Sequence, residues 1–539
     1  MATPRSSVPG GLLLALLLNG CADVKRSEHT NEAPSTPAPV EPFRSAEPVA
    51  GLEVDSAAVA AYIAGWDRRA TDSAGFMDHY RHRRFVGGWV TDDGHLTHAG
   101  EVFLHLTSTS DSLLHGMRLH HDTTVQGLVS RAGEPGQIRL PDPLGSELAL
   151  TAAFFPFAQE RYEGVDADRT RSLHWFIPTH KKDASAMLEA LTADSTDLAP
   201  YEPVHPQYQA LRRMLRTYRA LELKGGWEPV PVPKAPLHKG DSDPAVSSVR
   251  KRLTATGDIA RDDRSADFDT GLEAGVKRYQ VRNGMDTTGR IDEALVQEMN
   301  RPIGDRVRQI MLNMERLRWL DGHAPDDFLL VNIPEYRLHV FEGGREVWDM
   351  VVVVGKPATR TEVFSGNLST VVLAPYWNIP QSILDKDVIP GMRRDPNYVK
   401  RLHLEVVSEH PLQVRQKPGE FNSLGLAKFL FPNSYSIYMH DTPSKGLFER
   451  PDRAFSHGCV RLKEPAKLAA YLLRDRAEWT PEAIQAAMHG GAERAIPVTR
   501  PVPVHIVYLT AWVDGQGRLN FRDDVYGRDA RLAAELFVN

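Results

Sequence analysis

The sequence predicts a multidomain protein in which helical regions precede a mostly-β domain that carries an insertion. Its 539 residues are enough for three or four domains of about 150 residues each. Apolar residues recur at helical spacing between residues 51 and 301, whereas alternating or continuous apolar runs bounded by glycine turns follow residue 326. With 42% hydrophobic and 25% charged residues, the composition is that of globular domains. A net charge of −6 without a basic block argues against nucleic acid as a partner.

Residues 1–21 have the pattern of an export signal. Arg5 supplies a positive charge ahead of an apolar run, residues 11–18, that is too short to span a bilayer. The run leads into Leu-Asn-Gly-Cys, which resembles a bacterial lipobox and implies lipidation of Cys21; an ordinary secretory signal cut nearby is the alternative. We therefore expect a periplasmic protein that is lipid-anchored to a membrane, with the alanine after the cysteine favouring the outer membrane. Residues 22–50, rich in Pro, Ala, Glu and Ser, are expected to form a flexible linker.

Residues 51–230 are predicted to form a helical domain. Apolar spacing indicates a helix over 56–66 and is clearest over 208–219, where four side chains recur on one face. These side chains are Tyr208, Leu211, Leu215 and Tyr218. Gly225 and Gly226 follow and are expected to end that helix. Because an aromatic helix face is more often core than ligand site, we assign no chemistry to this region.

A Pro-rich linker, residues 229–236, leads to a predicted three-helix domain over 237–301. Each helix presents three side chains to a shared core. The sets are Val246, Val249 and Leu253; Val276, Tyr279 and Gln280; and Ile291, Leu295 and Met299. A further helix over 305–320 is expected to turn its apolar residues inward and its arginines outward, and to link this domain to the next. Its apolar residues are Ile310, Met314 and Leu317.

A mostly-β domain is predicted for residues 326–500. Its first strands are expected over 328–333, 336–341 and 346–354. The dipeptide Gly343-Gly344 between the last two is typical of a hairpin turn.

A polar insertion is expected within this domain, from about 382 to 431. Its basic residues suit an anionic ligand, although a charge run is usually a solvated face. They are Arg393, Arg394, Lys400 and Arg401. A helix over 465–476 follows the insertion. Residues 501–539 are expected to add a C-terminal hairpin, with strands over 502–512 and 518–521, and a tail that pack on this domain.

The strongest chemical signal is the run Ser-His-Gly-Cys-Val-Arg at residues 456–461, with His440 nineteen positions before the cysteine. An unperturbed thiol has a pKa of about 8.5, so near neutral pH it needs a base, and an imidazole can take its proton. We therefore expect Cys459 to be a nucleophile and His440 its base. Gly458 has no Cβ and lets the backbone approach an incoming carbonyl, where backbone N–H groups could hold an oxyanion.

The residues before His440 alternate as a half-buried strand does, which puts Ser436, Tyr438 and His440 on one face. Three other interpretations compete. Cys459 could be a small buried hydrophobic residue, the histidines could belong to the core, or two histidines and the cysteine could bind zinc. If Cys21 carries lipid, however, Cys459 has no partner in an oxidising compartment, and such an unpaired thiol indicates reactivity.

A histidine followed at this distance by Ser-His-Gly-Cys, an apolar residue and Arg resembles the signature of the L,D-transpeptidase catalytic domain of the YkuD type. The resemblance implies that Cys459 is acylated and that His440 is the general base, oriented by the backbone carbonyl of Asp441. It also implies supporting and substrate-binding residues around them. The supporting residues are Ser456, His457 and Gly458, and the substrate-binding residues are Tyr438, Arg461 and Trp377. It implies no metal and no other cofactor.

The other regions resemble those of the large YcbB-like members of this family. The resemblance implies that 51–230 is a scaffold domain and that 237–301 is a peptidoglycan-binding module, for which a packing spacer is the alternative. It also implies that the insertion forms a mobile cap over the site.

The function implied is an L,D-transpeptidase that makes 3→3 cross-links through a cysteine thioester. Its partners would be peptidoglycan stem peptides, a donor tetrapeptide and an acceptor amine. Two alternatives stay open: a hydrolase, acting as an L,D-carboxypeptidase or releasing wall-attached protein, and a catalytically silent peptidoglycan-binding protein. The sequence leaves the oligomeric state open.

Overall fold

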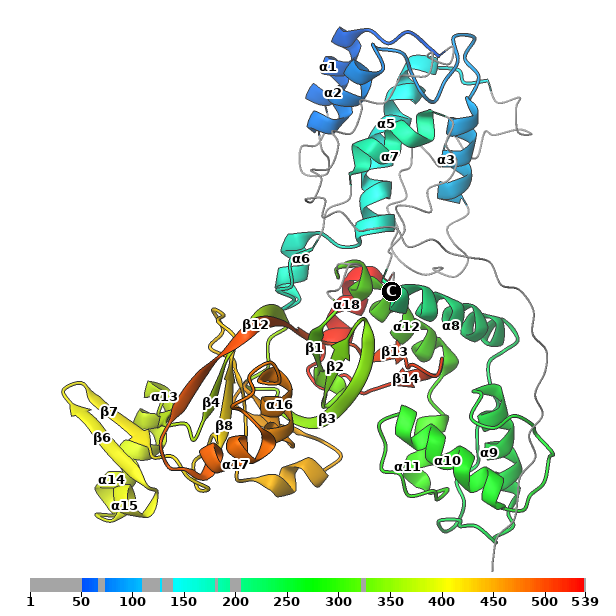
Figure 1. Cartoon of the computed structure of the whole chain (residues 1–539). Coiled ribbons are helices and arrows are strands. Elements are labelled where there is room, and N and C mark those ends of the chain that lie inside the picture. The colour runs from blue at the N-terminus through cyan, green and yellow to red at the C-terminus, as the bar shows by residue number, and fades with distance from the viewer. Residues whose placement is uncertain are drawn as a thin grey trace, which may run out of the picture. The chain divides into compact units, whose positions relative to one another are not determined.

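The computed structural model describes residues 51–65, 73–108, 127, 139–179, 183–193, 205–320 and 326–537. The predicted signal over 1–21 with Cys21, and the linker over 22–50, lie outside this part of the chain and stay predictions. The predicted fold class is confirmed: helices form the N-terminal regions, and a mostly-β domain follows (Figure 1). Of the helices in the described segments, none is both long and apolar enough to cross a bilayer.

The N-terminal helical region has its own core, in which Trp89, Phe103 and Phe154 are fully buried. Its helices are α1 (Ser56–Ala64), α2 (Ser73–His82), α3 (His98–Ser108), α5 (Pro143–Ala158), α6 (Ala167–Ser172) and α7 (Ala184–Thr192). Glu147 of α5 is buried, and its carboxylate accepts the backbone N–H groups of three consecutive residues, 88–90, at 2.9, 2.9 and 3.0 Å. These bonds satisfy a carboxylate that burial would otherwise penalise.

Helix α8 (Pro206–Leu223) buries the four predicted side chains of its apolar face. Gly225 and Gly226 follow it with φ of 93° and 79°, conformations that favour glycine, as expected at a helix end. The helix belongs to the predicted N-terminal region, and its apolar face also joins the core of the mostly-β domain, where it packs on α12 (Ile303–Arg318) and on β13 (Ala511–Val513).

The three-helix module has a separate core around Val249, Val276 and Leu295. Its helices are α9 (Pro244–Ala255), α10 (Thr270–Arg282) and α11 (Glu293–Met299), each capped by an aspartate side chain. Ile291 is buried as predicted, but it precedes α11 and forms a β-bridge with Leu237.

The arginines of helix α12 lie differently from the prediction. Its arginines were expected to face outward, but Arg306, Arg316 and Arg318 are buried. Each has an acidic partner: Arg316 pairs with Asp529 at 2.6 Å, Arg318 with Glu315 at 2.5 Å, and Arg306 with Glu298 of the three-helix module. The prediction was wrong because α8, α18 (Arg528–Leu536) and β13 all pack on α12, and buried guanidinium groups persist when they are paired.

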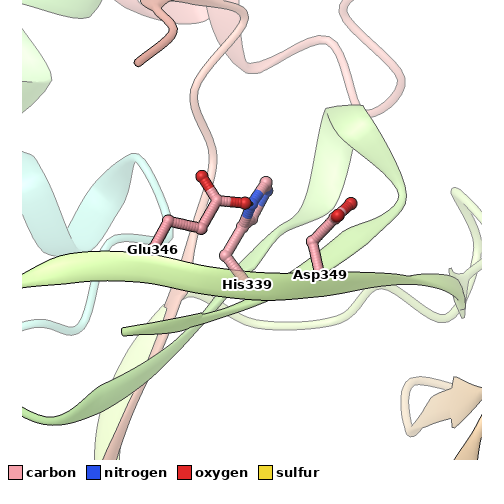
Figure 2. A group of neighbouring side chains, drawn as sticks. All are labelled: His339, Glu346 and Asp349. Carbon is pink, nitrogen blue, oxygen red and sulfur yellow. The ribbon is translucent and has the colours of Figure 1, made fainter. Parts of the chain in front are cut away.

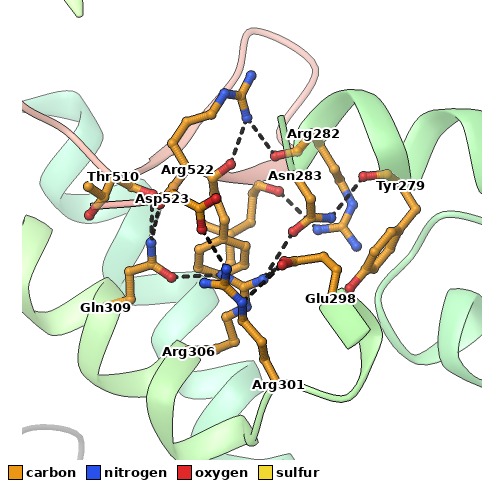
Figure 3. A network of polar contacts seen from close by, with 12 residues as sticks. Tyr279, Arg282, Asn283, Glu298, Arg301, Arg306, Gln309, Thr510, Arg522 and Asp523 are labelled. Atoms are coloured by element: carbon orange, nitrogen blue, oxygen red, sulfur yellow. Dashed lines mark hydrogen bonds and ion pairs between the residues drawn. The ribbon is translucent and has the colours of Figure 1, made fainter. Parts of the chain in front are cut away.

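A polar network joins the three-helix module, α12 and the C-terminal segment (Figure 3). Gln309 donates to the carbonyls of Thr510 and Arg522 at 3.1 and 2.8 Å. Arg522 donates in turn to the carbonyl of Arg282 at 2.9 Å, and Arg301 pairs with Asp523 at 2.5 Å. These contacts connect residues more than 200 positions apart in the sequence.

The mostly-β domain is built on one nine-stranded sheet, in the order β10-β3-β11-β9-β8-β4-β12-β1-β2, and pairing of β2 with β3 closes it on itself. The strands are β1 (Phe328–Asn332), β2 (Arg337–Glu342), β3 (Arg345–Gly355), β4 (Phe364–Leu373), β8 (Ala427–Leu430), β9 (Met439–His440), β10 (Ala454–Ser456), β11 (Val460–Leu462) and β12 (Arg494–Val507). The predicted hairpin joins β2 to β3. Helices α16 (Pro465–Leu472) and α17 (Pro481–His489) pack on β8 and β4.

The C-terminal hairpin differs from its prediction. Residues 502–507 belong to β12, which lies between β4 and β1 in the central sheet. The hairpin is formed by β13 and β14 (Leu519–Phe521), and α18 follows it. Alternation alone could not separate a central strand from a hairpin strand, because both present one apolar face.

The insertion folds around its own small core, which includes Leu384, Val388 and Val414. It contains a three-stranded sheet in the order β5-β7-β6 and short helices (Figure 1). These elements are β5 (Trp377–Asn378), α13 (Gln381–Ile383), α14 (Ile389–Arg394), α15 (Tyr398–Arg401), β6 (Leu404–Glu409) and β7 (Leu412–Gln416). The predicted end near 431 is too late, since β8 already belongs to the central sheet from Ala427 onward.

Candidate active site

Two neighbouring strands, β9 and β11, bring four of the predicted site residues to one face of the sheet. β11 runs parallel to β9, with Val460 opposite Met439 and Arg461 opposite His440. Val460 and Met439 are buried in the core, so the residues that alternate with them face the other side. Tyr438, His440, Cys459 and Arg461 therefore share a face, as the sequence pattern predicts for the first two. The strand that contains His440 is shorter than predicted, because only Met439 and His440 pair as β9.

The turn between β10 and β11 presents the cysteine. Gly458 has φ of 114°, and a Cβ there would lie 3.3 Å from the carbonyl oxygen of Arg360. Ser456 holds the turn from inside: its hydroxyl donates to the carbonyl of Cys459 at 2.6 Å and accepts the N–H of Gly458 at 3.1 Å. The N–H of Gly458 is therefore already used within the turn.

The thiol of Cys459 is half-buried, and its polar neighbours come from the strand beside it. The sulfur lies 3.9 Å from the carbonyl oxygen of Ser436, and the hydroxyl and N–H of Tyr438 can hydrogen-bond to it. Burial raises the pKa of the Cys459 thiol, and the contacts with Tyr438 and the charges of Arg461 and Lys428 oppose that rise only in part. The resting thiol is therefore protonated at neutral pH.

His440 is buried on the same face, and its Nδ1 lies 2.5 Å from the carbonyl oxygen of Asp441. A carbonyl oxygen can only accept, so Nδ1 carries the proton in the neutral ring. The backbone of Leu424 also hydrogen-bonds to the imidazole. Burial and the charge of Arg461 lower the pKa of His440 to about 4, which leaves the ring neutral at pH 7. Both Cys459 and His440 contact Tyr438, whose ring centroid is 5.7 Å from the imidazole, but no hydrogen bond joins the thiol to the imidazole.

The remaining predicted residues differ in how close they lie to the cysteine turn. His457 is exposed, and the charges of Lys386 and Asp387 in the insertion act on it, so that segment lies near the turn. Arg461 is half-buried, and its Nε has no hydrogen-bond partner. Trp377 pairs with Gln416 in the small sheet of the insertion rather than in the central sheet, and no contact joins it to Cys459 in the described structure.

Models of known families match three parts of the chain. Residues 75–215 match the "Scaffold domain", 242–299 the "Putative peptidoglycan binding domain" and 326–504 the "L,D-transpeptidase catalytic domain". The chain contains an L,D-transpeptidase catalytic domain. The turn with Cys459 and the strand with His440 both lie inside that domain.

A protein of Haemophilus influenzae described as "Putative L,D-transpeptidase" is 33% identical over 244 residues, a match that covers 42% of this chain and 49% of the relative. Among solved structures, L,D-transpeptidase 1 of Mycobacterium tuberculosis is 14% identical, covering 34% of this chain and 61% of that one, with a TM-score of 0.18. An L,D-transpeptidase of Stackebrandtia nassauensis is 12% identical, covering 50% and 94%, with a TM-score of 0.23. The family models identify the domains of this chain.

Sequence analysis missed the loop that braces the cysteine turn of the L,D-transpeptidase domain. Thr359 donates to the carbonyl of Ser456 at 3.0 Å, and Thr361 donates to the carbonyl of Gly458 at 2.8 Å. The hydroxyl of Tyr526 donates to the carbonyl of Gly355 and accepts the N–H of Thr361. The glycine that ends β3 predicts a turn, but nothing local to it indicates partners about 100 or 170 residues away.

Replacing Gly458 by alanine should lower activity by about 100-fold. A side chain at this φ is strained by about 1–3 kcal/mol, and the Cβ would press on the Arg360 carbonyl, so the turn must shift. Misplacing a reacting group by about 1 Å can cost 100-fold. The measurement is turnover of a tetrapeptide donor, with Gly446→Ala as control because a Cβ there meets nothing within 4 Å. Full activity of Gly458→Ala would show that this turn need not be held.

A second cluster of ionisable groups lies on the β2–β3 hairpin of the same domain (Figure 2). His339, Glu346 and Asp349 place their ligand atoms within 4.8 Å of one another, as a metal site would. The imidazole is already occupied, however: Nδ1 bonds to Glu346 at 2.8 Å and Nε2 to buried Glu335 at 3.0 Å. Asp349 pairs with Arg337. Burial opposes the charged ring, but both glutamates outweigh it and raise the pKa of His339 to about 10, so the cluster fits an imidazolium between carboxylates better than a metal.

Replacing His339 by glutamine should destabilise the protein by about 3–5 kcal/mol at pH 7, since it leaves Glu335 buried without a cation. The pKa of His339 is higher folded than unfolded, so its stabilisation is complete below about pH 6.5 and is lost as pH rises through about 10. Urea unfolding at pH 7 and pH 10 checks both statements, with exposed His489→Gln as control. An equal difference between wild type and variant at both pH values would contradict the assignment.

Proposed function

We propose that this protein is a peptidoglycan L,D-transpeptidase that forms 3→3 cross-links through a thioester at Cys459. The observation that carries the proposal is the half-buried thiol on one face of the sheet with Tyr438, His440 and Arg461, inside the L,D-transpeptidase domain. The match of residues 242–299 to a peptidoglycan-binding model supports peptidoglycan as the substrate.

The first half-reaction acylates the cysteine. The sulfur attacks the carbonyl carbon at the L-centre of diaminopimelate, the third residue of the donor tetrapeptide. A carbon–sulfur bond forms, the carbon–nitrogen bond to the terminal D-alanine breaks, and the thiol proton passes through Nε2 of His440 to the leaving amine. Because burial keeps thiol and imidazole neutral at rest, proton transfer accompanies the attack and no thiolate–imidazolium pair precedes it.

Two details follow from the contacts in the resting site. The thiol must turn from the Ser436 carbonyl toward the imidazole, a change that substrate binding can drive because catalytic hydrogen bonds often tighten only in the complex. Since the N–H of Gly458 bonds to Ser456, we assign the developing oxyanion to the N–H of Cys459. In the second half-reaction the side-chain amine of another stem attacks the thioester and releases Cys459.

Incubating the purified protein with tetrapeptide muropeptides tests the proposal. Cross-linked dimers, identified by mass spectrometry, are expected. Tripeptide monomers alone would overturn cross-linking in favour of an L,D-carboxypeptidase, which shares the thioester but transfers it to water. An unchanged tetrapeptide would overturn both and support a silent binding protein.

A further inference from the structure

Lys428 is a cation beside the proposed nucleophile that neither the motif nor the mechanism uses. It lies on β8 directly opposite His440 of β9, while its neighbour Phe429 lies opposite Met439. Directly opposite residues of an antiparallel pair share a face, so Lys428 lies on the face of the sheet that carries Tyr438 and Cys459. Its ammonium nitrogen is 5.4 Å from the centroid of the Tyr438 ring.

The ammonium group of Lys428 is half-buried, and no ion pair joins it to any described carboxylate. Lys445, by contrast, pairs with Asp441, while Arg461, already predicted to bind substrate, also has an unpartnered Nε. Glu493 acts on Lys428 from a longer distance, and its carboxylate accepts the N–H of Tyr376 at 2.7 Å. Burial lowers the pKa of Lys428, and Glu493 and the ionised form of Cys459 oppose that fall only in part.

An uncompensated cation at this place fits an anionic group of a ligand. Half-buried charges are costly unless they are paired, and active sites are where such charges concentrate. The charge of Lys428 favours the thiolate form of Cys459, and the register of β8, β9 and β11 puts both residues on one face. A peptide attacked at its penultimate carbonyl carries a free carboxylate only one residue beyond the attacked carbon. The Tyr438 ring between lysine and thiol would lie along that last residue.

We propose that Lys428 binds the terminal carboxylate of the donor stem peptide, and so restricts the site to donors with a free C-terminus. The assignment rests on the proposed function, since it needs a donor whose last residue leaves. Lys428 is thus a specificity residue. Lys428 holds the carboxylate of the terminal residue while the thiol attacks. When that residue leaves, its carboxylate leaves with it, and the subsite is open for the acceptor.

The experiment compares a tetrapeptide donor with its C-terminal amide, following release of the terminal residue. The wild type should prefer the free acid by about 10- to 100-fold in kcat/KM, mainly through KM, as expected for a charge-assisted hydrogen bond. Lys428→Met should lose this preference because kcat/KM falls for the acid donor alone. Lys428→Arg should restore part of the preference. Lys467→Met removes an exposed lysine that lies over Trp348 and should behave as wild type.

Each other result has a distinct meaning. If Lys428→Met slows the reaction of acid and amide donors equally, the lysine supports the thiol or the fold, and the proposal is overturned. The rate at which iodoacetamide alkylates Cys459 then distinguishes these two roles. A wild type that does not distinguish acid from amide also overturns it, while the proposed function stands. A wild type that releases no terminal residue from either donor overturns the proposed function, and the role of Lys428 with it.

Discussion

Alanine at position 459 should give a folded protein that forms no cross-linked dimers. The proposed reaction needs a sulfur atom to form the thioester, and no other described cysteine can replace it. Folding should be unaffected, because the thiol is half-buried and its neighbours in the turn are held through backbone atoms and the Ser456 hydroxyl. The measurements are muropeptide dimers by mass spectrometry and the thermal unfolding midpoint.

Serine at the same position is the matched control for this loss. It replaces the thiol by a smaller hydroxyl that can also hydrogen-bond but is a much poorer nucleophile with a neutral imidazole as base. Dimer formation by Cys459→Ala at the wild-type rate would remove the cysteine from the mechanism, however well the protein folds.

Replacing His440 by alanine should reduce kcat/KM for the donor by about 100- to 10,000-fold, the usual contribution of a general base. The ring must be neutral to accept a proton. Burial and Arg461 lower its pKa to about 4, so the activity of the wild type should fall as pH decreases through about 4 rather than 6.5. His440→Ala should lose that acid limb together with the rate.

The pH dependence needs a control for acid unfolding. Circular dichroism of wild type at each pH supplies it, and His489→Ala, an exposed histidine of α17, should keep both the rate and the acid limb. An acid limb near pH 6.5 that persists in His440→Ala would assign the proton transfer to another group.

Local sequence patterns predict those elements whose buried faces are set by the spacing of residues only a few positions apart. The apolar face of α8 was predicted to the residue, because helical spacing depends only on neighbours three and four positions apart. The burial of the α12 arginines was not, because their partners include Asp529, which no pattern near the helix reveals. The late end predicted for the insertion has the same cause: β8 is recognisable as central only through its pairing with β4.

The candidate site shows the same limit. The motif predicts Cys459 as nucleophile and His440 as base, and the carbonyl of Asp441 lies where the prediction puts it, at Nδ1 of the imidazole. The environment of the thiol was not predictable, since Tyr438 and Lys428 reach it through the register of β8 and β9 with β11, which follows them only after β10. Burial also reverses a simple expectation: it disfavours both charges, so the thiol and the imidazole rest as a neutral pair.

The hydroxyl of Tyr526, which braces the loop behind the cysteine turn, belongs to a segment that leaves the ribosome after the whole catalytic motif. A nascent polypeptide that has already delivered Cys459 and His440 still lacks this support. The thiol therefore acquires its final setting only after translation has passed residue 526. A product truncated shortly before Tyr526 would contain every residue of the motif and still lack the hydroxyl that fixes the carbonyl of Gly355.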